Sequence, residues 1–223
     1  MKSYFCTQIY DMTKPQLRAV GIYHLTDARY FAAQDVQWVG FPLDEATENY
    51  LDPMRVRIIA EWIQGPTNVG EFEIADVEHI RQTLQKVGFD AVQLGAFATA
   101  SDAAALSEFT VFKALVAHTV GEVVDWHIQC ASFRPYIEAM VFDFARNGIT
   151  WAELQADLAA KNALHYLCHH YPVCLRLPNQ AANLTAILQL PLYALDLGGD
   201  TEEQTGMKDF DALNDFFDAW EAV

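Results

Sequence analysis

The densest group of chemically versatile side chains is the segment HYLCHHYPVC, which runs from His165 to Cys174. Histidine and cysteine are common zinc ligands, and two histidines four residues apart on a helix share a face. His165 and His169 have this spacing. The segment is expected at the end of a helix that leads into the next strand. Residues at such a position usually contribute to packing and helix capping. We therefore favour a structural role over a zinc site and expect no metal.

Composition narrows the function classes. The chain carries 14 Lys+Arg against 30 Asp+Glu, a net charge of -16, which argues against nucleic acid or an anionic membrane as the partner. A local patch or a helix N-terminus can still bind phosphate on an acidic protein. A content of 52% hydrophobic and 20% charged residues excludes disorder. Four cysteines at irregular spacing predict no disulfide framework, so the expected location is the cytoplasm.

The usual local signatures of several enzyme classes are absent. The sequence has no G-x-G-x-x-G, no P-loop, no C-x-x-C and no G-x-S-x-G. These motifs mark dinucleotide and phosphate loops, thiol redox centres and nucleophile elbows. The sequence therefore predicts no nucleotide cofactor and no serine-hydrolase chemistry.

Short β-rich runs alternate with helical patterns along the whole chain. Most of the runs are continuously apolar, which is typical of strands covered on both faces. Eight repeats of this alternation predict a single (β/α)8 barrel, with a doubly wound sheet as the alternative. The barrel is expected over residues 18–223, after an N-terminal extension of residues 1–17. The predicted strands are Arg18–Ile22, Gln37–Phe41, Asn68–Phe72, Ala91–Leu94, Thr110–Val116, Ala139–Phe142, Val173–Leu177 and Tyr193–Leu197.

Helices are predicted in the gaps from N-cap residues, first-turn prolines and terminal glycines. They cover Asp27–Gln34, Asp52–Ile63, Ile74–Val87, a short segment capped at Ser101, Thr150–His169, Asn179–Leu190 and Phe210–Glu221.

Five stretches in order resemble the phosphoribosylanthranilate isomerase family. AVGIYHLTDARYFAAQDVQWVGF resembles the family's opening, in which a K-I-C-G-I-T strand, a D-A-rich helix and a G-A-D-x-x-G-F strand follow one another. Two short stretches follow: NYLDP (Asn49–Pro53) resembles the family's R-Y-V-S-P, and DAVQLGA (Asp90–Ala96) resembles its V-Q-L-H-G strand. VFKAL (Val111–Leu115) resembles I-K-A of strand five. The last stretch, ALDLGGDTEEQTGMKDFDALNDFF (Ala194–Phe217), resembles V-D-V-S-S-G-V-E…G-x-K-D. The resemblance runs from about Arg18 to the end and implies a (β/α)8 barrel.

The resemblance implies an Amadori rearrangement in tryptophan biosynthesis, without a cofactor. An acid opens the ribose ring to a Schiff base, and a base then removes the C2′ proton. The family's acid is an aspartate at the end of strand six, which corresponds to Asp143 in the run MVFD. Burial beside Phe142 and Phe144 would favour its protonated form. The alternative for Asp143 is a solvated or helix-capping residue.

Several family positions have changed. The cysteine that serves as base corresponds to Val20, and a valine cannot accept a proton. The arginine that binds the anthranilate carboxylate corresponds to Asn49. The glycine-rich loop after strand six is shortened to Ala145–Trp151, and Leu175-Arg176 replaces the paired glycines of strand seven.

Other residues are candidates for the lost roles. His24, just past the first strand, is a candidate base near neutral pH, or else a solvated or capping residue. Arg176 is a candidate phosphate ligand, or else the partner of a nearby aspartate. Asp196 with Gly198 and Gly199 keeps part of the family's strand-eight motif and leaves room for phosphate, although a glycine pair also forms plain turns.

Two functions remain open at this point. The first is a phosphoribosylanthranilate isomerase, or an enzyme for a related phosphosugar isomerisation. The second is a non-catalytic barrel that binds a small ligand or a protein. The expected ligand is a phosphorylated small molecule, with no nucleic acid and no membrane, and a homodimer is left open.

Overall fold

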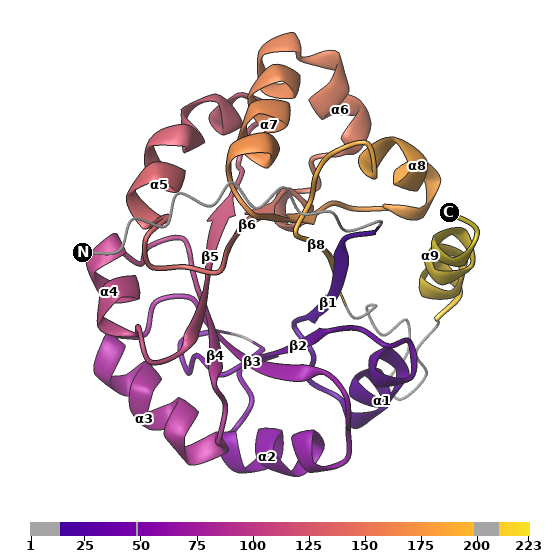
Figure 1. Ribbon diagram of the computed structural model, residues 1–223. Helices are drawn as coiled ribbons and strands as arrows, with labels where there is room; N and C mark the ends of the chain where they lie inside the picture. The colour runs from indigo at the N-terminus through magenta and orange to yellow at the C-terminus, as the bar shows by residue number, and fades with distance from the viewer. Residues whose placement is uncertain (1–13, 48, 199–209) are drawn as a thin grey trace.

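The described residues form a closed barrel of eight parallel strands in the order β1 to β8 (Figure 1). The computed structural model describes residues 14–47, 49–198 and 210–223. Pairing of β1 with β8 closes the sheet. The predicted (β/α)8 barrel is confirmed. The strands are β1 (Gln16–Val20), β2 (Trp38–Pro42), β3 (Thr67–Phe72), β4 (Ala91–Leu94), β5 (Thr110–Val116), β6 (Ala139–Asp143), β7 (Val173–Arg176) and β8 (Ala194–Gly198).

Helices surround the strands as an outer ring (Figure 1). They are α1 (Leu25–Ala33), α2 (Pro53–Glu61), α3 (Val77–Val87), α4 (Ala100–Ala105), α5 (Trp126–Phe133), α6 (Trp151–Ala156), α7 (Leu158–His170), α8 (Leu184–Ile187) and α9 (Asp211–Glu221). The last helix packs beside the first, where the rings of Phe31 and Phe217 have centroids 6.5 Å apart. Tyr30 of α1 also stacks on Phe210, the residue before α9, with centroids 4.4 Å apart.

Two apolar layers explain why the strands are hydrophobic on both faces. The larger layer lies between the strands and the helices and includes Leu17, Ala19 and Phe142. The smaller one fills the barrel interior and includes Phe112 and Val141. Because successive residues of a strand point to opposite faces, each strand contributes to both layers. This arrangement leaves the inward positions nearest the C-terminal strand ends for polar residues.

Local signals set most helix boundaries. Asp76 accepts a hydrogen bond from the His79 backbone N–H at 2.9 Å and caps α3, which ends at the left-handed Gly88 with φ 76°. Thr150 and Glu153 form a reciprocal capping box at the start of α6. These caps fix where each helix leaves the barrel rim.

Several boundaries differ from the sequence prediction, and two of these differences each depend on one residue. β1 begins at Gln16, inside the predicted extension, and ends at Val20, because Gly21 with φ 66° turns the chain out of the strand. The single helix predicted over Thr150–His169 is two helices. Asp157 is extended (φ -89°, ψ 108°) and accepts the Ala160 N–H at 3.0 Å, so it ends α6 and caps α7.

Within the described part of the chain, no helix is both long and apolar enough to cross a membrane. No group of three or more His, Cys, Asp or Glu side chains suited to a metal was found among the same residues. His165 and His169 lie on α7, where the His169 Nδ1 atom is 2.8 Å from the His165 carbonyl oxygen. Cys130, Cys168 and Cys174 are buried free thiols.

Gly95 follows β4 and allows the chain there to approach Glu73, which follows β3. A Cβ atom at Gly95 would lie 2.5 Å from both the Glu73 Cα atom and its carbonyl oxygen. We expect Gly95→Ala to lower the free energy of unfolding by about 1–3 kcal/mol, since two backbones must move apart. Urea unfolding followed by circular dichroism measures this change.

Gly121→Ala is the matched control, because a Cβ atom there would meet nothing within 4 Å. It should leave stability within about 0.5 kcal/mol of the unmodified protein. An equal loss in both variants would contradict the packing argument.

Candidate active site

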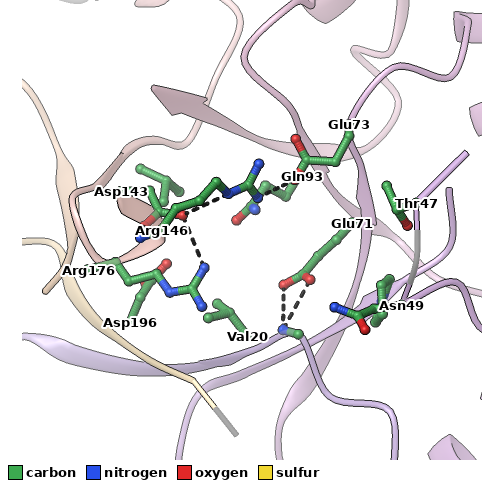
Figure 2. Close-up of a pocket in the computed structure, with 13 residues that line it drawn as sticks. Val20, Thr47, Asn49, Glu71, Glu73, Gln93, Asp143, Arg146, Arg176 and Asp196 are labelled. Atoms are coloured by element: carbon green, nitrogen blue, oxygen red, sulfur yellow. Dashed lines mark hydrogen bonds and ion pairs between the residues drawn. The ribbon is translucent and has the colours of Figure 1, made fainter. Parts of the chain in front are cut away.

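A cavity of about 430 Å³ opens at the C-terminal ends of the strands (Figure 2). Val20, Pro42, Asp143 and Arg176 each end a strand and each line it. Enzymes with this fold place their active sites at this end of the barrel. The lining is completed by Gly21, Thr47, Asn49, Glu71, Glu73, Gln93, Val141, Arg146 and Asp196.

Asp143 lies at this cavity, with its side chain 5% exposed. Its Oδ2 atom accepts a hydrogen bond from Arg176 Nη1 at 3.0 Å and lies 3.7 Å from Arg146 Nε. Its Oδ1 atom accepts the Arg146 backbone N–H at 3.0 Å. Asp143 therefore combines the cavity position expected of an acid with the turn-capping contact considered as its alternative.

Arg176 connects the cavity to a second hollow of about 360 Å³ beside the ends of β7 and β8. This second hollow is also lined by Asp196, Gly198 and Asn179. A Cβ atom at Gly198 would lie 3.4 Å from Arg176 Nη2, so the glycine and the guanidinium are neighbours. Three of the four residues predicted to bind phosphate thus come together. The fourth, Gly199, lies outside the described residues.

Asp196 has a different environment from the one expected of a phosphate ligand. Its side chain is 0% exposed and its Oδ1 atom lies 3.5 Å from Arg18 Nε, an arginine that is also buried. Burial raises the pKa of Asp196, opposed by the charges of Arg18 and Arg176. A carboxylate repels a phosphate, so Asp196 forms the floor of the cavity with Arg18 rather than a direct phosphate contact.

Glu71 is a second carboxyl group of the cavity whose pKa is raised by its environment. Burial raises its pKa to about 7, although Arg176, the Gly21 N–H and Arg18 oppose the shift. The Gly21 backbone N–H donates to both carboxylate oxygens, at 3.2 and 3.1 Å. Figure 2 shows this carboxylate directed at the end of β1, beside Val20. Near neutral pH such a group exchanges a proton readily.

A second carboxylate, Glu73, is held in an ion pair at the cavity mouth. Arg146 Nη2 donates to Glu73 Oε1 at 2.5 Å. The backbone around Glu73 is fixed by Asp44, whose Oδ2 atom accepts the N–H groups of Glu73, Ile74 and Ala75 at 2.9, 2.6 and 3.0 Å. Glu73 and Arg146 therefore neutralise each other across the opening.

The structure does not bring His24 into this group. His24 is the residue before α1, and it is not among the described residues that line the cavity. Its ring packs edge-on against Tyr23, with centroids 5.0 Å apart. Val20, where the resemblance places a catalytic cysteine, does line the cavity, as does Asn49.

Sequence reasoning missed Glu71, Glu73, Gln93 and the buried Arg18 as parts of the site. One signal was available for Glu71, which is the only charged residue in the predicted strand Asn68–Phe72 and lies near its C-terminal end. Its approach to β1 could not be found in this way, because it depends on how three strands are placed in the barrel.

A closed parallel barrel with a polar cavity at its C-terminal rim defines a (β/α)8 protein with the layout of an enzyme. The family described as N-(5'phosphoribosyl)anthranilate (PRA) isomerase matches residues 17–219. The chain therefore belongs to the phosphoribosylanthranilate isomerase family, as the resemblance implied.

Individual relatives agree with this assignment. The N-(5'-phosphoribosyl)anthranilate isomerase of Bacillus licheniformis is 29% identical over 143 residues, which is 62% of this chain and 63% of that protein. The match thus spans less than two-thirds of the relative.

Solved structures show the same fold. The phosphoribosyl anthranilate isomerase of Thermus thermophilus has a TM-score of 0.74 at 23% identity, over 93% of this chain and 98% of that one. Another phosphoribosyl anthranilate isomerase, solved with reduced 1-(o-carboxyphenylamino)-1-deoxyribulose 5-phosphate, has a TM-score of 0.69 at 20% identity, over 94% and 100%.

The raised pKa of Glu71 predicts a pH-dependent effect of Glu71→Gln on stability. A carboxyl whose pKa rises from 4.5 to about 7 on folding destabilises the protein increasingly as pH rises between these values. The glutamine stays neutral and can still accept the Gly21 N–H. We therefore expect it to gain roughly 1–3 kcal/mol of stability at pH 8 and little at pH 4.5.

Thermal unfolding at the two pH values measures this gain. Glu61→Gln is the control, because Glu61 is exposed on α2 and should show no such growth with pH. An equal shift for Glu71→Gln at both pH values would contradict the assigned burial effect.

Proposed function

We propose that this protein isomerises N-(5′-phosphoribosyl)anthranilate in tryptophan biosynthesis. Family membership supports this function. The observation that carries it is the pairing of Asp143 with Arg176 at neighbouring ends of β6 and β7, beside Gly198 of β8. An acid for ring opening then lies next to a site for the phosphate of the same substrate.

The phosphate is proposed to bind at the mouths of β7 and β8, where this fold commonly holds phosphate. Arg176 supplies the positive charge that the paired glycines of the family do not, and Gly198 leaves the approach open. A phosphate that binds Arg176 also takes away one of the two positive charges beside Asp143.

The other anionic end of the substrate is a carboxylate, and Asn49 provides no charge for it. Arg146 follows β6, is 44% exposed, and extends its guanidinium from Asp143 to Glu73. We propose that Arg146 takes over recognition of the anthranilate carboxylate. Arg176 and Arg146 would then each bind one anionic group of the substrate, with Asp143 between them.

Asp143→Asn tests the acid. The variant keeps a side chain that can accept the Arg146 N–H but cannot donate a carboxylic proton. We expect the rate of isomerisation, followed by the fluorescence decay of freshly made substrate, to fall by about 10²–10⁴-fold with little change in melting temperature.

Asp125→Asn is the control, since Asp125 is exposed and does not line the cavity. It should keep the rate of the unmodified protein. An active Asp143→Asn variant would remove Asp143 from the mechanism, and an inactive unmodified protein would overturn the proposed function.

The phosphate site is tested with inorganic phosphate. A ligand that binds the folded state raises the melting temperature by mass action. We expect millimolar phosphate to raise that of the unmodified protein, measured at constant ionic strength, and to leave that of Arg176→Gln unchanged. Sulfate-free chloride buffer serves as the reference. An equal rise in both proteins would place the phosphate elsewhere.

A further inference from the structure

The rearrangement needs a base as well as an acid, and the end of β1 offers only Val20. Four carboxylates line the cavity: Glu71, Glu73, Asp143 and Asp196. Three of them have an arginine in an ion pair, which are Glu73 with Arg146, Asp143 with Arg176 and Arg146, and Asp196 with Arg18. Glu71 is the remaining one, and its described hydrogen bonds come from a neutral backbone N–H.

We propose that Glu71, reaching across β2 to the end of β1, is the general base of this enzyme and stands in for the side chain missing at Val20. The inference rests on the proposed isomerase function and adds the group that function still lacks.

The path of the Glu71 side chain depends on Gly40. Glu71 belongs to β3, and β2 separates β3 from β1. A Cβ atom at Gly40 of β2 would overlap the Glu71 Oε1 atom. Because Gly40 has no side chain, the carboxylate passes over β2 and meets the N–H of Gly21, the residue after Val20. The base is thus delivered to the β1 position from a neighbouring strand.

The acid and the base are on different sides of the cavity. Asp143 ends β6 and Glu71 lies on β3, three strands apart around the closed barrel. Figure 2 shows the two carboxylates on different sides, with Val20 below the space between them. A sugar held between them would present its ring oxygen to one group and its C2′ hydrogen to the other, as acid–base catalysis requires.

The surroundings of Glu71 suit a base that acts near neutral pH. Burial disfavours its charged form, and Asp196 adds to this effect. The charges of Arg176 and Arg18 oppose it, so the carboxylate is not driven fully to its neutral form. A base with this balance is ionised enough to take a proton and basic enough to keep it through the transition state.

The proton balance closes with these two residues. Asp143 gives its proton to the ring oxygen, and the C1′–O bond breaks to leave a protonated Schiff base. Glu71 takes the C2′ proton, while the C–H electron pair forms the C1′=C2′ bond and the imine π pair moves to nitrogen. Tautomerisation returns the proton of Glu71 to C1′, and the 2′-hydroxyl proton leaves through solvent to restore Asp143. No oxidant or reductant is needed.

The closing experiment compares the unmodified protein with Glu71→Gln, Val20→Cys and the double variant in the same fluorescence assay. We expect Glu71→Gln to lower kcat by at least about 100-fold with a much smaller change in KM. In the unmodified protein kcat/KM should rise with pH through a midpoint near 7, and this limb should be missing in Glu71→Gln. Because Glu71→Gln is predicted to be more stable than the unmodified protein at pH 8, loss of folding would not explain a lower kcat. Circular dichroism checks that the variant is folded.

The double variant distinguishes a role of Glu71 as a base from a purely structural role. The double variant, with a cysteine at position 20, should have a kcat at least about tenfold higher than that of Glu71→Gln, since a thiolate there reaches the same proton. Iodoacetamide should abolish the restored activity and leave the unmodified protein active. A role of Glu71 in holding the barrel together would not be rescued in this way.

Each other outcome overturns a defined claim. Full kcat in Glu71→Gln would overturn the base assignment alone and leave the isomerase function standing. Turnover by Val20→Cys but not by the unmodified protein would overturn both the proposed function of this chain and the role of Glu71 as base, and would show that the pocket is intact. No turnover by any of the four proteins would overturn the proposed function together with the inference.

Discussion

The buried ion pair of Arg18 and Asp196 is the interaction on which the rest of the site depends. The two residues are register partners on β1 and β8, the strands whose pairing closes the barrel. Arg18 also donates to Gln93 Oε1 at 2.6 Å and lies 4.2 Å from the centre of the Phe112 ring. One side chain thus links four strands beneath the cavity. Removing either charge would leave the other buried and unpaired, which is far more costly than the pair itself.

Above this floor, charge is distributed so that only one carboxylate lacks an arginine partner among the described ion pairs. Arg146 and Arg176 hold Glu73 and Asp143 at the rim, while Glu71 is left with a backbone donor. The arrangement costs stability near neutral pH, because burial raises the pKa of Glu71 to about 7 and so opposes its ionisation. Such a cost is common at sites whose chemistry needs a group with an altered proton affinity.

The fold could be predicted from the sequence because the signals for its strands and helices are local and repeated. Apolar runs such as VQWVGF and VFKALV predict strands covered on both faces, and caps such as Asp76 and Thr150 mark helix starts. The predicted boundaries were wrong where a single residue sets the end of an element. Asp157 divides one predicted helix into two, and Gly21 ends β1 earlier than predicted. In the site, the family resemblance pointed to Asp143 and to Arg176, and both residues lie at strand ends that meet at one rim. Glu71 was not found in this way, since its meeting with β1 depends on the absent side chain of Gly40.

By itself, the sequence determined the barrel and the family, because both follow from residue types and their order along the chain. Its resemblance to the family also pointed to Val20 as a position without a proton acceptor. Only the tertiary structure decided which group faces that position. A side chain from β3 reaches the end of β1 over β2, and the distance between such strands in space has no fixed relation to their separation in sequence. The same holds for Asp196, which chain order placed with the phosphate ligands and which closure of the barrel pairs with Arg18.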